Sequence, residues 1–98
     1  MKLWIDDTRP APYGFYWIKT VNEAIAYIQE YFDEIEIIDL DHDAGDYVHW
    51  GGDYIQILNW LDMIHFNRPI KIHIHSMNPV GVQNMRAIIE RNDWTEIY

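Results

Sequence analysis

Short apolar runs alternate along the chain with longer stretches in which apolar side chains recur every three or four residues. The short runs predict five strands, at residues 2–6, 15–19, 36–40, 70–75 and 94–98. The periodic stretches predict three helices, at residues 21–32, 53–66 and 79–91. Two helices have start signals, because Thr20 and Glu23 form a capping box and Asn78 precedes a proline.

Strands that alternate with helices predict an α/β fold, as a single domain over residues 1–98. We expect a five-stranded parallel sheet in the flavodoxin-like order 2-1-3-4-5, with helices on both faces as a three-layer sandwich. Residues 8–14 contain Pro10, Pro12 and Gly14, so they predict a loop in place of the first crossover helix. Ligands of such sheets bind at the carboxyl ends of the strands, which makes the residues after each strand the candidate site.

The chain is strongly acidic, because 16 Asp and Glu against 7 Lys and Arg give a net charge of −9. This charge argues against a nucleic-acid duplex or an anionic membrane as partner, but not against a small phosphorylated ligand held through a metal ion. The absence of Cys excludes disulfides, thiolate catalysis and cysteine zinc sites. No apolar run approaches the ~18 residues of a membrane helix, and residues 1–7 are unlike a signal peptide, so we expect a cytoplasmic protein.

Carboxylates gather at two of the strand ends. Asp6 and Asp7 follow the first strand, and Asp41 follows the third. Carboxylates brought together repel one another, and a divalent cation such as Mg²⁺ or Mn²⁺ relieves the repulsion while contacting phosphate oxygens. The three acids therefore predict a metal site. The alternative is that Asp7 caps the following loop and Asp6 only ends a strand.

Two histidines also stand at strand ends. His42 lies between Asp41 and Asp43, and His75 ends the fourth strand. An imidazole exchanges protons near neutral pH, so the pair predicts joint acid–base chemistry; the alternative is two ordinary polar residues. His73 lies two residues before His75, and we expect it to be buried packing.

The start of the last helix offers phosphate contacts. Free backbone N–H groups and the helix dipole favour an anion there, and Gly81 would let a ligand approach the backbone. Asn78 caps this helix in either case. Ser76 would donate to a phosphate oxygen or satisfy the turn, and Arg9 would clamp a phosphate or pair with Asp7.

Three of these features resemble the response-regulator receiver domain: the acidic pair after the first strand, Asp41 after the third and Ser76 after the fourth. In that family the acids hold Mg²⁺, the third Asp receives a phosphoryl group, and the Ser or Thr senses it. Two features depart from it, since no Lys follows the fifth strand and a loop replaces the first helix.

A closer resemblance, over nearly the whole chain, is to the cyclic-phosphate processing receiver-like family. It rests on the segments LWIDDTRP at residues 3–10, LDHDAG at 40–45 and HSMNPVGVQNM at 75–85. Ala44 departs from the larger aliphatic residue expected there. The resemblance implies a receiver-like fold and processing of cyclic phosphates on nucleotide- or ADP-ribose-derived molecules. It also adds Asp43 and Asn84 to the expected ligand-binding residues.

The function that we expect is metal-assisted hydrolysis of a cyclic phosphate on such a molecule. One of His42 and His75 would take a proton from water and the other would protonate the leaving oxygen, or Asp41 would attack as a nucleophile. The alternatives are a non-catalytic receiver-like module that binds a protein or nucleotide, and a metal-dependent phosphomonoesterase. The sequence leaves open the organic part of the substrate and the oligomeric state. It also leaves open whether Tyr47 and Trp50 stack on a base or form an assembly surface.

Overall fold

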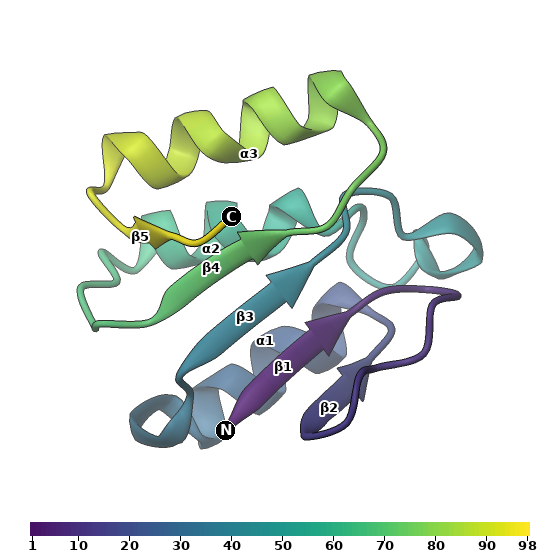
Figure 1. Ribbon diagram of the computed structural model, residues 1–98, viewed down its shortest axis with the longest axis horizontal. Helices are drawn as coiled ribbons and strands as arrows, with labels where there is room; N and C mark the ends of the chain where they lie inside the picture. Colours follow the sequence, from purple (N-terminus) through teal and green to yellow (C-terminus); the bar gives the residue numbers. More distant parts are fainter.

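Five parallel strands form one sheet in the computed structural model, which describes residues 1–98. In the order β2-β1-β3-β4-β5 they are Phe15–Ile18, Lys2–Ile5, Ile37–Leu40, Lys71–Ile74 and Thr95–Glu96. The arrowheads of β1, β3 and β4 point to the same edge of the sheet (Figure 1). The expected order, the parallel direction and the loop in place of the first crossover helix are all confirmed.

Three helices connect the later strands: α1 (Val21–Glu30), α2 (Ile55–Met63) and α3 (Pro79–Arg91). Short 3₁₀ turns lie at Phe32–Glu34 and Gly45–Tyr47. The start signals act as expected, because Thr20 Oγ1 accepts a hydrogen bond from Glu23 N (3.0 Å) and Asn78 Oδ1 accepts one from Gly81 N (3.0 Å). None of the helices has the length and apolar character needed to cross a membrane.

All three helices pack on the same face of the sheet, which differs from the expected three layers. α2 contacts both α1 and α3, so the helices form one row, and α1 and α2 lie behind the strands in Figure 1. The physical reason is the direction of the crossovers. The steps from β2 to β3, β3 to β4 and β4 to β5 all advance the same way across the sheet, and right-handed crossovers then place every helix on one side.

The two faces of the sheet differ in character because side chains alternate along each strand. The face under the helices is fully apolar, with buried side chains from Leu3, Ile5, Ile18, Ile38, Leu40 and Ile72. On the other face the strand register places Trp17, Trp4, Asp39 and His73 in a row. No helix covers this side of the sheet, which we call the open face.

Candidate functional site at the carboxyl edge of the sheet

The three expected metal ligands meet in the structure. Asp6 and Asp7 follow β1, Asp41 follows the neighbouring strand β3, and one carboxylate oxygen from each lies within 4.8 Å of the others. Parallel strands that end at the same edge explain why residues 35 positions apart in the chain become neighbours. We call Asp6, Asp7 and Asp41 the acid cluster.

Asp6 is a fully buried carboxylate with every oxygen engaged. Its Oδ1 accepts hydrogen bonds from the backbone N–H groups of Thr8 and Arg9, each at 2.9 Å, and its Oδ2 faces His75 Nε2 at 2.9 Å. Burial alone would raise the pKa of Asp6, but these bonds outweigh it and hold the pKa below its ordinary value. Asp6 is therefore an anion at neutral pH.

The pKa of Asp7 shifts in the opposite direction, above its ordinary value. Burial raises its pKa, and the negative charges of Asp6 and Asp41 raise it further. Gly45, which has a φ of 56°, packs directly against the Asp7 carboxylate, and any β-carbon there would collide with it. Three carboxylate groups that repel one another are a donor set suited to a hard divalent cation, so the residues fit Mg²⁺ or Mn²⁺.

His42 is held by polar groups on one side of its ring. Its Nδ1 lies 2.8 Å from Asp43 Oδ1 and 3.5 Å from Asn78 Nδ2, while Nε2 has no protein partner. Gly81 packs on the ring, and a β-carbon at that position would come within 2.5 Å of it. Gly81 therefore packs on His42, and the expected approach of a ligand at this glycine stays a prediction.

His75 lies between two carboxylates. Its Nδ1 is 2.6 Å from Asp39 Oδ1, its Nε2 is 2.9 Å from Asp6 Oδ2, and its side chain is only 9% exposed. The indole of Trp4 stacks on the ring in parallel, with centroids 3.8 Å apart. Burial lowers the pKa of His75, but the bonds to both carboxylates raise it above its ordinary value overall.

The remaining expected residues are less tightly placed. Ser76 Oγ accepts a hydrogen bond from Asn78 N at 3.1 Å, which satisfies the turn. Arg9 is exposed and its guanidinium forms no ion pair, so the expected alternative of a pair with Asp7 is not seen. Asn84 is an exposed residue of α3 with no side-chain hydrogen bond.

Comparison with known proteins gives one match. The family model of the cyclic-phosphate processing receiver domain matches residues 1–91. The chain belongs to this family. No curated protein and no solved structure matches it. The family match covers every expected site residue, from Asp6 to Asn84, and confirms the resemblance carried by the three segments above.

Sequence reasoning missed three neighbours of the site in this cyclic-phosphate processing receiver domain. Asp39 and His73 extend the polar network from His75 across the open face, and Asp53 Oδ1 accepts a hydrogen bond from Ala44 N at 2.9 Å beside His42. His73 is 33% exposed and hydrogen-bonded, so the expectation that it is buried packing is wrong. The available signal was the pattern Asp-x-Asp and His-x-His, which places Asp39 and His73 on the open face.

The receiver domain has no deep pocket at this edge. Its two surface hollows, of about 400 and 290 Å³, are lined by the loops that precede β3, β4 and β5, at the opposite end of the strands. A ligand at the acid cluster would therefore be held by charge and hydrogen bonds on a shallow surface, rather than by enclosure.

Proposed function

We propose that this domain hydrolyses a cyclic phosphodiester on a nucleotide- or ADP-ribose-derived small molecule, with the help of a divalent cation. The observation that carries the proposal is the meeting of the acid cluster with His42 and His75 at one sheet edge in a member of the cyclic-phosphate processing family. A strained cyclic phosphate needs charge neutralisation and a proton carrier to open, and these side chains offer both.

In the proposal Asp6, Asp7 and Asp41 hold Mg²⁺ or Mn²⁺. When bound, such an ion supplies neutralisation of the charge that develops on the phosphate oxygens. The three carboxylates bring the negative charge that attracts the ion, and the hydrogen bonds to Asp6 fix that carboxylate before any ligand arrives.

His42 carries the proton transfers. Its Nε2 accepts a proton from a water molecule whose oxygen forms the new bond to phosphorus, and the bond from phosphorus to one ring oxygen breaks. His42 then returns that proton to the leaving sugar oxygen, and a phosphomonoester results. Asp43 Oδ1, which accepts a hydrogen bond from Nδ1–H, orients the ring for this role, and Asn78 Nδ2 donates to the same Asp43 oxygen.

His75 has a different part in the proposal from the one that its sequence position suggested. Both of its nitrogens face carboxylates, whereas His42 Nε2 has no protein partner, so we assign His75 to holding Asp6 rather than to exchanging protons with the ligand. Arg9, Ser76 and Asn84, together with the start of α3, supply the phosphate and substrate contacts. Asp41 serves as a metal ligand, with nucleophilic attack as the alternative.

The test is a panel of 2′,3′-cyclic nucleotides and ADP-ribose cyclic phosphate, incubated with the protein and Mg²⁺ or Mn²⁺ and analysed for phosphomonoester product. We expect turnover of at least one substrate, and a loss of about 10²–10⁴ in kcat for His42→Gln, because that is the usual contribution of acid–base catalysis. His65→Asn is the matched control. His65 is exposed at the far end of the strands and has a φ of 55°, which Asn tolerates.

Three outcomes would contradict the proposal. Binding of the cyclic compounds without product would identify a non-catalytic module. Release of phosphate from nucleoside monophosphates, with the cyclic substrates left intact, would identify a phosphomonoesterase. Equal turnover by wild type and His42→Gln would remove His42 from the mechanism.

A further inference from the structure

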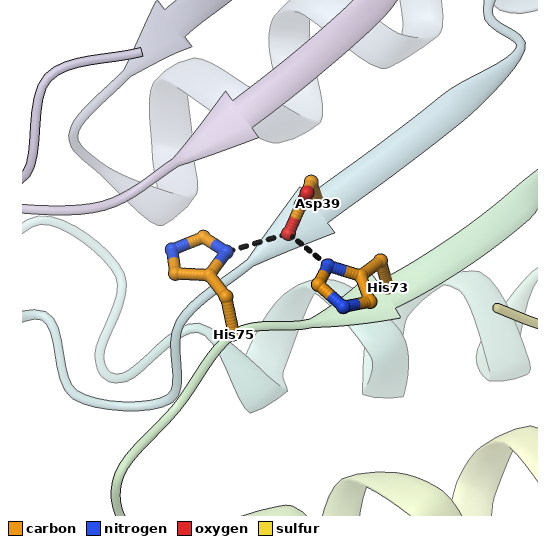
Figure 2. A group of neighbouring side chains, drawn as sticks. All are labelled: Asp39, His73 and His75. Atoms are coloured by element: carbon orange, nitrogen blue, oxygen red, sulfur yellow. Dashed lines mark hydrogen bonds and ion pairs between the residues drawn. The ribbon is translucent and has the colours of Figure 1, made fainter. Parts of the chain in front are cut away.

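A second cluster of ligand atoms lies on the open face, beside the acid cluster. His73 and His75 both direct Nδ1 at the same oxygen of Asp39, at 2.9 and 2.6 Å, and Asp39 lies between the two rings in Figure 2. Asp39 lies in β3 and His73 in the adjacent strand β4, paired in register, and His75 follows β4 directly. Two imidazoles and a carboxylate thus converge on one point of a rigid sheet.

We propose that Asp39, His73 and His75 bind a zinc ion. Two imidazole nitrogens and one carboxylate oxygen are a set of three protein ligands that Zn²⁺ accepts, with the fourth position left to water. The same set disfavours Mg²⁺, which prefers oxygen ligands. The domain would therefore hold two different cations, zinc at the His–Asp cluster and a harder ion at the acid cluster.

The environment of His75 supports the proposal independently of the cluster itself. Histidines that bind a metal through one nitrogen usually donate the other N–H to a carboxylate, which fixes the ring and strengthens the ligand. His75 has this arrangement, because Nε2 faces Asp6 Oδ2 at 2.9 Å while Nδ1 points into the cluster. Trp4, stacked on the ring at 3.8 Å, holds the same orientation.

The spacing and access of the cluster also suit a metal. The three ligand atoms lie within 4.8 Å of one another, and ligands about 2.0 Å from a tetrahedral zinc are roughly 3.3 Å apart. A small outward movement of the rings from their hydrogen-bonded positions would therefore make room for the ion. Asp39 is 8% exposed and His73 is partly exposed on the face that no helix covers, which gives the ion a route from solvent.

The test is calorimetric titration of Zn²⁺ into the metal-free protein, with excess Mg²⁺ present to occupy the acid cluster. We expect one zinc per chain. Loss of a residue that only holds a metal ligand in place weakens metal binding by up to about 100-fold. Because His73 is itself a proposed ligand, His73→Gln should weaken zinc binding at least that much. Asp39→Asn should weaken it in the same way. His65→Asn, which removes an exposed histidine far from both clusters, should retain zinc binding close to that of the wild type.

A measurement on the wild-type protein keeps the proposal testable if a variant fails to fold. Long-range ¹H–¹⁵N NMR spectra of the histidine rings should show the Nδ1 resonances of His73 and His75, and no others, shift with one equivalent of zinc. Absence of zinc binding, shifts confined to other histidines, or binding unchanged in His73→Gln would overturn the proposal. None of these results bears on cyclic-phosphate turnover, which is measured separately.

Discussion

At the scale of single residues, the contact between Gly81 and His42 makes a sharp prediction. A glycine in a helix usually costs about 1 kcal/mol relative to alanine, so Gly→Ala is normally stabilising there. At Gly81 the new β-carbon would press on the imidazole at 2.5 Å. We expect Gly81→Ala to lower the free energy of unfolding by about 1–3 kcal/mol, as overpacking does, and to displace the His42 ring.

Urea unfolding and the NMR shifts of the His42 ring measure both effects. Ala87→Gly, at an exposed position of the same helix, is the control, and it should cost roughly 0.5–1 kcal/mol from backbone freedom alone. A Gly81→Ala protein that is more stable than the wild type, with His42 unmoved, would show that the two residues are not in contact.

The site residues divide into those that the sequence could predict and those that it could not. Asp6, Asp41 and His75 were predictable because each follows an apolar strand, and the ends of parallel strands meet at one edge. Asp39 was not, because it stands inside an apolar strand and its partner lies 34 residues away. A carboxylate at position 39 is explained only once it is known that Asp39 lies on the face of the sheet that no helix covers.

At the scale of elements, the strands and helices could be predicted from periodicity, while their ends depended on side chains. The second helix starts at Ile55 instead of residue 53, where the Asp53 carboxylate is bonded to Ala44 N. It ends at Met63, shortly before His65 adopts a φ of 55° that no helix allows. The single helical layer follows from the predicted strand order and right-handed crossovers once the first crossover has no helix, but the expectation of three layers did not apply that rule to each crossover in turn.

The one-sided core predicts unequal effects for two neighbours in β3. Ile38 is fully buried under the helices, whereas Ile37 is half-buried on the open face. We expect Ile38→Ala to cost about 2–4 kcal/mol in the free energy of unfolding, and Ile37→Ala clearly less, because only the first leaves a cavity in packed surroundings. Urea unfolding of the two variants measures the difference. Equal losses would mean that another layer covers the open face.

At the scale of the whole molecule, the net charge of −9 includes three carboxylates that meet in the acid cluster, where the ends of β1 and β3 lie side by side. The charges of Asp6 and Asp41 oppose the charge on Asp7, so without a cation this meeting of the two strands works against folding. A cation bound there would reverse the effect, since a ligand that binds only the folded state adds about 2.7 kcal/mol at 100 times its Kd.

Thermal unfolding with and without Mn²⁺ tests this balance. In a domain of this size 1 kcal/mol corresponds to roughly 4–8 °C, so saturating Mn²⁺ should raise the Tm of the wild type by several degrees. In EDTA, Asp7→Asn should have a higher Tm than the wild type, because the substitution removes a charge that Asp6 and Asp41 repel. Addition of Mn²⁺ should raise its Tm less than that of the wild type, because the substitution also removes a ligand of the ion. Asp46→Asn removes an exposed charge outside the cluster and should retain the wild-type gain. If Mn²⁺ raises the Tm of Asp7→Asn and of the wild type equally, the ion binds elsewhere on the acidic surface and the acid cluster is not its site.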